Sequence, residues 1–314
     1  MKALVFSGQG SQYVGMSADL AQQFPQAAAR LQEANDILGY DCSKIMASGP
    51  DDVLKQTRYT QPALFIHEAI LLDLTGLSAE ATAVAGHSLG EYSALYAAGV
   101  LGFADALRLV NVRATQMYDV GNAVPGTMAA IVGLDDDKVL QLCALFDGKG
   151  GERIVAANFN APGQVVISGS ADYVRALLPE FKNAGAKLVK ELTVSGAFHS
   201  PLLEGALPPL QDALMATTFE NARCDVYVNV TAQAIRSGHA LREALAQQLV
   251  APVLWTQSIN TMYNAGIKQY VEIGPGKVLQ GLIKRIAPEA SVSGIDTAAD
   301  VAAFLERKHG ATQG

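Results

Sequence analysis

The stretch Ala81-Thr82-Ala83-Val84-Ala85-Gly86-His87-Ser88-Leu89-Gly90-Glu91-Tyr92 places a serine between two glycines, after an apolar run and before a helix-forming run. A G-x-S-x-G pattern between a strand and a helix is typical of a nucleophilic serine on a sharp turn. Side chains at positions 86 and 90 would collide across that turn. The stretch therefore predicts a Ser88 hydroxyl above the amino end of a helix, where N–H groups favour negative charge. The alternative is a glycine-rich turn with an incidental serine.

The composition is that of a globular protein with a large core. Of the 314 residues, 50% are hydrophobic and 17% are charged, and the formal net charge is −7. This charge argues against nucleic acid as a partner, and an acidic partner would need a local basic patch. The three cysteines have no metal or redox spacing, which favours buried thiols in a reducing compartment. No apolar run fits a signal peptide or approaches the ~20 residues that span a bilayer, so we expect a cytoplasmic protein.

The pattern of predicted elements changes near Gly126. Over residues 126–194 it predicts strands at 127–132, 153–159, 164–168 and 187–193, with helices at 135–146 and 171–184. This β-α-β-β-α-β order is the ferredoxin-like, or split βαβ, pattern. Later strands at 225–230, 269–273 and 291–295 continue the first part of the chain. We therefore predict an α/β protein in which a small domain, 126–194, is inserted into a large domain formed by 1–125 and 195–314.

Two other motifs fail at a required position. The segment Gly8-Gln9-Gly10 follows a predicted strand, but Tyr13 stands where a dinucleotide fingerprint needs glycine. Such a loop could equally offer N–H groups to an oxygen in an active site. The pair His67-Glu68 lies on a predicted helix, but Leu71 replaces the second histidine of a zinc motif. The sequence therefore predicts no metal site.

A nucleophilic serine needs a base, and the chain has five histidines: His67, His87, His199, His239 and His309. His67 falls within a predicted helix, and His87 adjoins Ser88 on a turn where neighbouring side chains point apart. The last two fall in a polar loop and near the carboxyl end. His199 remains as the candidate base, with the near-neutral pKa that this role needs, although a loop histidine is often simply solvated.

Arg113 lies within an otherwise apolar helical stripe. At i, i+4 spacing it shares a face with Leu109 and Met117 on the predicted helix 103–120. A buried arginine is costly unless it has an anionic partner. One interpretation is a structural salt bridge; the other is a clamp for a carboxylate, which a planar guanidinium binds bidentately.

Five segments together carry a resemblance to a known family. They are Gly8-Gln9-Gly10-Ser11-Gln12, Gly86-His87-Ser88-Leu89-Gly90-Glu91-Tyr92, Arg113, Gly196-Ala197-Phe198-His199-Ser200-Pro201 and Glu272-Ile273-Gly274-Pro275-Gly276. In this order and spacing the chain resembles the malonyl-CoA:acyl carrier protein transacylases of fatty acid synthesis. It is similar also to the acyltransferase domains of polyketide synthases. The segments span nearly the whole chain; one departure is Ser7, where the family commonly has proline.

The resemblance implies an α/β-hydrolase-like large domain with a parallel sheet core and a ferredoxin-like insert. It also implies roles for individual residues. Ser88 would be the nucleophile and His199 the base, oriented by the backbone carbonyl of Gln248 rather than by an acid. The oxyanion hole would consist of the backbone N–H groups of Gln9 and Leu89.

The resemblance further implies how the substrate is selected. Arg113 would hold the free carboxylate of the malonyl group, and we expect Met117 on the same helix face to line that site. Asn158 and Asn160 match a stretch that faces the site from the small domain. Phe198 is the bulky residue usual in malonyl-type members, which favours malonyl over methylmalonyl.

The implied reaction moves a malonyl group from malonyl-CoA to the phosphopantetheine thiol of acyl carrier protein (ACP). The acyl group would wait on Ser88, which gives ping-pong kinetics. No cofactor is implied beyond the coenzyme A thioester and holo-ACP as substrates. ACPs are generally acidic, so we expect a local basic docking patch on a monomer. Candidates for the patch are Lys182, Lys187, Lys190, Lys277, Lys284 and Arg285.

Other function classes remain open from the sequence. A discrete acyltransferase that serves a polyketide or polyunsaturated lipid synthase in trans would carry nearly the same motifs. An acyl hydrolase would need an acid between Ser88 and His199; Asp172 and Glu191 lie there, but neither follows a recognisable strand-end motif. A non-catalytic scaffold of the same fold would not require Ser88, His199 and Arg113 together.

Overall fold

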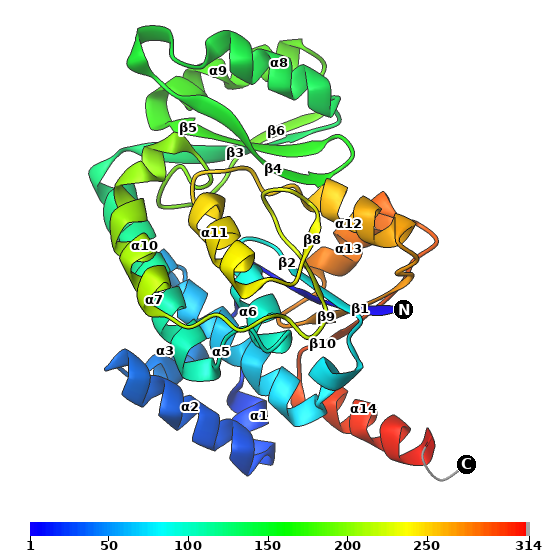
Figure 1. Ribbon diagram of the computed structural model, residues 1–314. Helices are drawn as coiled ribbons and strands as arrows, with labels where there is room; N and C mark the ends of the chain where they lie inside the picture. Colours follow the sequence, from blue (N-terminus) through cyan, green and yellow to red (C-terminus); the bar gives the residue numbers. More distant parts are fainter. Residues whose placement is uncertain (312–314) are drawn as a thin grey trace.

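β1 (Lys2–Phe6) and β2 (Ala83–Gly86) lie next to each other in the middle of a six-stranded sheet (Figure 1). The structure is a computed structural model that describes residues 1–311. The strand order is β10-β9-β1-β2-β7-β8, and all pairs are parallel except β7 with β8. The other strands of this sheet are β7 (Asp225–Tyr227), β8 (Ala234–Ile235), β9 (Gln269–Ile273) and β10 (Ser291–Ile295). The predicted α/β class is confirmed.

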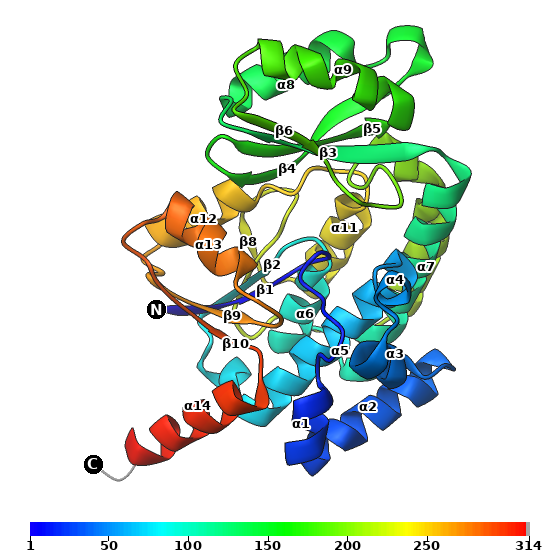
Figure 2. The same cartoon turned by 180° about the vertical axis from the view of Figure 1, so that it is seen from behind.

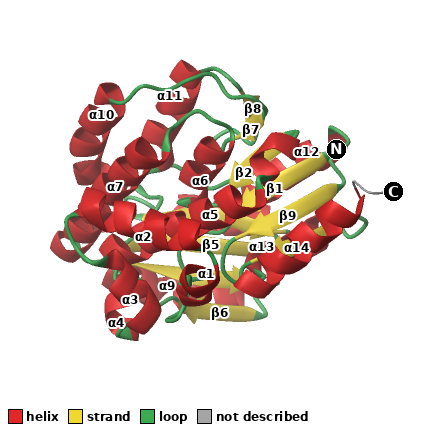
Figure 3. Cartoon of the chain, turned by 90° about the horizontal axis from the view of Figure 1, so that it is seen from below, coloured by secondary structure: helices red, strands yellow, loops and turns green. Residues whose placement is uncertain are grey.

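Helices cover both faces of this sheet. They are α1 (Ala18–Gln23), α2 (Pro25–Leu38), α3 (Cys42–Ser48), α4 (Asp51–Leu54), α5 (Thr57–Thr75), α6 (Gly90–Ala97), α7 (Phe103–Ala123), α10 (Leu207–Ala216), α11 (Gly238–Gln248), α12 (Trp255–Asn264), α13 (Val278–Ile286) and α14 (Ala298–Ala311). Leu4 and Phe6 pack into the core shared with α5, α6 and α7, whereas Ala3 and Val5 pack against α12 and α13. A strand buried on both faces reads as a continuous apolar run, as β1 does. Figure 3 shows β2, β1 and β9 side by side among these helices.

A second, antiparallel sheet lies above the carboxyl ends of the central strands (Figure 2). Its strands, in the order β4-β5-β3-β6, are β3 (Gly126–Val132), β4 (Ile154–Ala161), β5 (Gln164–Ser170) and β6 (Leu188–Glu191). α8 (Asp136–Phe146) and α9 (Ala171–Asn183) cover its outer face. Ala129 and Ile131 pack on that side, whereas Met128 belongs to the core shared with the larger part. Strand alternation therefore turns one face of the small sheet toward the site described below.

Two boundaries differ from the sequence prediction. From the sequence, Tyr59-Thr60-Gln61-Pro62 indicates a turn, with Pro62 near the first turn of a long helix. In the structure α5 begins earlier, at Thr57, and Pro62 lies inside it. Proline removes only the N–H that would bond to the carbonyl of Arg58 in the first turn, so the helix continues. β7 ends at Tyr227, earlier than predicted, because the N–H of Asn229 bonds to the Glu91 side chain instead of a strand.

Helix hydrophobicity and the state of the cysteines also bear on the sequence predictions. Among the helices of residues 1–311, none is long and apolar enough to cross a membrane. Cys42, Cys143 and Cys224 are buried and unpaired, as the sequence predicts.

A buried carboxyl group ties β1 to two helices. Glu68 of α5 is fully buried, and its two oxygens accept hydrogen bonds from Ser7, directly after β1, and from Ser93 of α6. Burial raises the pKa of Glu68 well above its ordinary value. The folded state therefore keeps the proton at a pH where the unfolded chain has lost it, so this group makes the protein less stable as pH rises above about 4.5.

Glu68→Gln is expected to remove that pH dependence. The amide can still meet one serine as an acceptor and the other as a donor, so stability at pH 4 should change little. Above pH 4.5 the free energy of unfolding of the variant should rise relative to that of the wild type by up to about 1.4 kcal/mol per pH unit. This rise should end at the folded-state pKa of Glu68. Thermal unfolding of both proteins from pH 4 to 8 measures this difference. A difference that stays constant with pH would show that Glu68 is ionised in the folded protein.

Candidate active site

The turn between β2 and α6 holds Ser88 in a conformation that few residues adopt. Ser88 has φ 55°, in the left-handed region. A Cβ added to Gly86 would lie 1.9 Å from the carbonyl carbon of Gly90, and one added to Gly90 would lie 2.2 Å from the carbonyl oxygen of Phe6. The two glycines are thus required by backbone contact. The turn raises the Ser88 hydroxyl at the carboxyl end of β2.

Gly86→Ala is expected to destabilise the fold by about 3 kcal/mol or more, because backbone atoms on both sides cannot make room for a methyl group. Gly281→Ala is the matched control, since Gly281 lies in α13 with no atom within 4 Å of an added Cβ. The control should gain about 0.5–1 kcal/mol from helix propensity. Urea unfolding of both variants checks the pair. A Gly86→Ala protein as stable as the wild type would contradict the contact argument.

His199 lies beside the hydroxyl of Ser88. Its Nε2 is 2.7 Å from Ser88 Oγ, and its Nδ1 is 2.9 Å from the carbonyl oxygen of Gln248 and 3.2 Å from that of Ala251. Carbonyls only accept, so Nδ1 carries the proton and Nε2 is free to accept one. Burial and the nearby Arg113 charge lower the pKa of His199 to about 3. This pKa is lower than the near-neutral value expected from the sequence, because the ring is buried beside a cation. The ring is therefore a neutral acceptor near pH 7.

Neither acidic candidate for a third member lies at this histidine. Asp172 and Glu191 both pair with Arg175 on the surface of the small sheet. The partners of His199 Nδ1 are backbone carbonyls. An arrangement with an acid, which an ordinary esterase would use, is not what the described residues form.

Arg113 reaches the same hydroxyl from α7. Its Nη2 donates to Ser88 Oγ at 2.9 Å and to Gln248 Oε1 at 2.9 Å, while Nη1 donates to Gln61 Oε1 at 2.7 Å. The guanidinium is 1% exposed, and its Nε, among the described residues, has no hydrogen-bond partner. These acceptors are all uncharged, so the salt-bridge alternative for Arg113 is wrong within the described part of the chain. A buried cation that has no anion in direct hydrogen-bond contact favours an anionic ligand.

The backbone N–H groups of Gln9 and Leu89 are unused. In residues 1–308 we find no hydrogen bond from either group. Gln9 is held by its side chain, which donates from Nε2 to Thr57 Oγ1 at 3.1 Å. Leu89 directly precedes α6, so its N–H belongs to the unpaired amino end of that helix.

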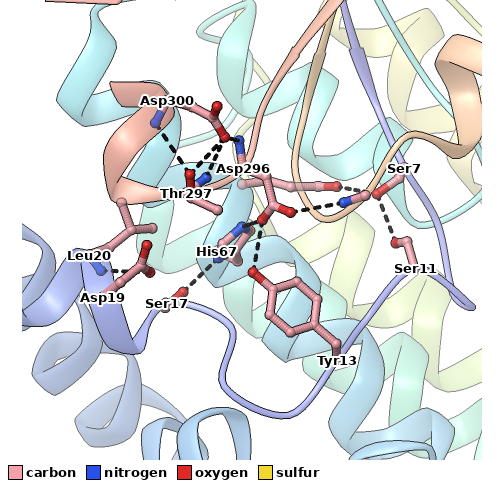
Figure 4. Close-up of polar contacts among 12 residues, drawn as sticks. Ser7, Ser11, Tyr13, Ser17, Asp19, Leu20, His67, Asp296, Thr297 and Asp300 are labelled. Carbon is pink, nitrogen blue, oxygen red and sulfur yellow. Dashed lines mark hydrogen bonds and ion pairs between the residues drawn. The ribbon is translucent and has the colours of Figure 1, made fainter. Parts of the chain in front are cut away.

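The loop that carries Gln9 is fixed at its far end by a polar cluster (Figure 4). Tyr13 donates to Asp296 Oδ1 at 3.1 Å, and His67 Nε2 lies 3.1 Å from the same oxygen. The other ring nitrogen of His67 is 2.7 Å from Ser17 Oγ. His67, which the sequence excluded as a zinc ligand, thus joins the first loop to the segment before α14.

Ser88, His199 and Arg113 line one cavity of about 170 Å³. Its lining residues are Gln9, Gln61, His87, Ser88, Leu89, Arg113, Met117, Met128, Asn158, Asn160, Val166, Leu192, Val194, Phe198 and His199. The structure thereby brings together every residue that the sequence analysis assigned to the site except Gln248, which lies behind Arg113 and His199. Asn160 Oδ1 is 2.8 Å from His87 Nε2, so this histidine faces the small sheet rather than Ser88.

Sequence reasoning missed two amides. Gln61 accepts a hydrogen bond from Arg113, but its segment indicated only a turn at the start of a helix. The Asn229 side chain accepts from the Ser88 N–H at 2.7 Å and donates to the Gly86 carbonyl at 2.6 Å, which braces the strained turn. No local sequence pattern indicates either residue, because Arg113 and Ser88, their partners, lie far from them in the chain.

The chain matches known proteins over almost its full length. Residues 3–312 match the family described as acyl transferase domain. The chain belongs to this acyl transferase family. It is similar to the malonyl CoA-acyl carrier protein transacylase of Escherichia coli (strain K12), with 42% identity over 307 residues that cover 97% of this chain and 98% of the relative. The resemblance inferred from the sequence motifs is confirmed.

Solved structures agree with this similarity. The malonyl-CoA:acyl carrier protein transacylase from Xanthomonas oryzae pv. oryzae is 39% identical, with a TM-score of 0.91 and 98% coverage of each chain. A malonyl-transacylase in complex with its type II PKS acyl-carrier protein is 38% identical, with a TM-score of 0.90, and the match covers 98% of this chain and 99% of that one.

Proposed function

We propose that this chain is an acyltransferase that moves a malonyl group from malonyl-CoA to the phosphopantetheine thiol of ACP. The observation that carries the proposal is the buried Arg113 guanidinium, 2.9 Å from Ser88 Oγ. A fixed cation beside the nucleophile favours an acyl group that ends in a carboxylate, as malonyl does. The relatives are malonyl transacylases, and one of them is bound to an acyl-carrier protein. Both facts support the same substrates for this chain.

In the first half-reaction, Ser88 Oγ attacks the thioester carbonyl while His199 Nε2 accepts the hydroxyl proton. The unpaired N–H groups of Gln9 and Leu89 stabilise the oxyanion. Collapse of the tetrahedral intermediate breaks the C–S bond, and the departing coenzyme A thiolate takes the proton from His199. The carbonyl of Gln248 holds the imidazole in the required tautomer throughout.

In the second half-reaction, the pantetheine thiol gives its proton to His199 and attacks the malonyl ester on Ser88. Collapse of this intermediate returns the proton to the serine and releases malonyl-ACP. These steps need no cofactor, because the thioester already activates the acyl group.

Other lining residues shape the acyl site. Met117 lies one turn from Arg113 on α7 and packs against the malonyl methylene, while Phe198 limits the space for a branch such as that of methylmalonyl. Asn158 and Asn160 face the same cavity from β4, with Asn160 fixed by its bond to His87. They close the site from the side of the small sheet.

We propose that the two sheets belong to two domains. Residues 1–125 and 195–314 form an α/β-hydrolase-like domain, which is supported by the parallel sheet and the Ser88 turn between β2 and α6. Residues 126–194 form a ferredoxin-like insert. Its β-α-β-β-α-β order and the antiparallel strand order β6-β3-β5-β4 support that description.

The acidic carrier docks on an exposed basic patch that borders both parts of the chain. Its six members are exposed cations: Lys182, Lys187, Lys190, Lys277, Lys284 and Arg285. Arg285 of α13 donates to the carbonyl of Pro162 and to the side chain of Gln164, so α13 and the small sheet meet there. We propose that the protein works as a monomer in the cytoplasm, without binding nucleic acid or membrane.

A transacylase that serves polyketide synthesis is the second candidate, and the similarity to the enzyme bound to a type II PKS acyl-carrier protein favours it. The chemistry is the same, and only the carrier differs. Purified protein mixed with malonyl-CoA and holo-ACP tests both. Malonyl-ACP should form with one carrier class or both, and the mass of the carrier identifies the product. Free malonate with unmodified carrier would instead identify an acyl hydrolase.

A further inference from the structure

A side-chain amide links the buried arginine to a buried carboxyl group. Gln248 Oε1 accepts from Arg113 Nη2 at 2.9 Å, and Gln248 Nε2 donates to Glu91 Oε2 at 3.1 Å. All three side chains are buried, with at most 1% exposed. Opposite charges thus stand on either side of one amide, oriented so that its oxygen faces the cation and its N–H faces the anion. A change of charge at one end of this buried series of side chains acts strongly on the other end, because little water screens the interaction.

Glu91 is held in place by this contact and one more. The backbone N–H of Asn229 donates to the same Glu91 Oε2 at 3.0 Å. No lysine or arginine within residues 1–308 forms a salt bridge with Glu91. Arg113 is likewise bonded to neutral oxygens. Across Gln248, these two buried charges therefore act on each other.

The substrate would bring a second anion to the same guanidinium. An ionised Glu91 attracts Arg113 but repels the arriving carboxylate, whereas a protonated Glu91 leaves the arginine charge to the substrate. Burial raises the pKa of Glu91 to about 7, although the Asn229 N–H, Gln248 and Arg113 act to lower it. Arg113 is the ionisable group whose charge acts on Glu91. Beyond the effect of burial, Glu91 in turn helps to raise the pKa of Tyr92, and Arg113 helps to lower the pKa of His199. The charge of Glu91 therefore changes within the working range of pH.

We infer that Glu91 is a specificity-determining positioning residue that acts on the malonyl carboxylate through Gln248 and Arg113. The inference rests on the proposed malonyl transfer. It does not require Glu91 to touch the substrate. Binding of the malonyl carboxylate should favour the protonated form of Glu91, and by linkage the ionised form should weaken malonyl capture.

Glu91→Gln tests this, because the amide oxygen can accept both N–H groups that now meet Oε2 while the charge is removed. The measured quantity is kcat/KM for malonyl-CoA between pH 6 and 9. The ratio of variant to wild type should rise with pH, by about tenfold across the range. Glu272→Gln is the matched control, since Glu272 is buried and accepts the N–H of Leu279 outside the cavity. Its ratio should stay flat.

A ratio for Glu91→Gln that does not change with pH would overturn the inference and leave Glu91 a structural residue. If the Glu91→Gln variant fails to fold, proton uptake by the wild-type enzyme tests the inference instead. Acylation by malonyl-CoA at pH 7 in weak buffer with an indicator dye should take up a fraction of a proton, and no uptake would overturn the inference. The mass of the malonyl adduct on Ser88 is recorded in the same samples. A wild type without that adduct would refute the proposed transfer itself, whatever the pH profile.

Discussion

Ser88→Ala is expected to abolish malonyl transfer, with kcat lowered at least about 10⁴-fold. No other hydroxyl lies within hydrogen-bond distance of His199 Nε2 among the described residues, so no neighbour can replace the nucleophile. Malonyl-CoA consumption and the mass of the enzyme after incubation measure the loss. The variant should show no malonyl adduct.

Folding of this variant is the necessary control. The N–H of residue 88 keeps its bond to Asn229, and the turn glycines are untouched, so the unfolding temperature should change little. A folded Ser88→Ala protein that still acquires a malonyl group on another residue would contradict the role proposed for Ser88.

Arg113→Ala should have the second largest effect and should act on selectivity. Removing the guanidinium takes away the partner of the malonyl carboxylate, and losing one member of a buried charge pair costs about 3–5 kcal/mol. Malonyl transfer should therefore fall about 100- to 4,000-fold in kcat/KM. Transfer or hydrolysis of acetyl-CoA, which has no carboxylate, should fall far less. The ratio of the two rates is the measurement.

Arg108→Ala is the matched control, because Arg108 lies on the same helix but is exposed and pairs with Asp105. It should leave the malonyl-to-acetyl ratio unchanged.

Gln61 and Gln248 already hold Arg113 in the absence of substrate, which limits the cost of leaving its charge without an anion. An Arg113→Ala enzyme with unaltered selectivity would refute the clamp.

Local patterns sufficed for the parts of the site that depend on local geometry. The Ser88 turn needs glycine on both sides within a few residues, and the strand before it and the helix after it are short-range signals. His199 came from elimination and Gln248 from resemblance, and each lies in the predicted place relative to its partner. The two-sheet arrangement followed from a change in element order.

The supporting amides could not be predicted because their partners are distant in sequence. Gln61 and Arg113 are separated by 52 positions, and Ser88 and Asn229 by 141. Asn229 also follows a strand that ends earlier than its apolar pattern suggests, since a side chain takes its N–H. Glu91 stands in the quoted motif, yet its link to Arg113 appears only once α6, α7 and α11 are packed together.

The lifetime of the acyl-enzyme is the most direct test of the central claim. The protein is acylated with malonyl-CoA, rapidly desalted, and divided between buffer and holo-ACP, and intact mass is followed over time. We predict a malonyl group on Ser88 that persists in buffer and passes to ACP when the carrier is added. Loss of the adduct as free malonate at the same rate with and without ACP would contradict the account.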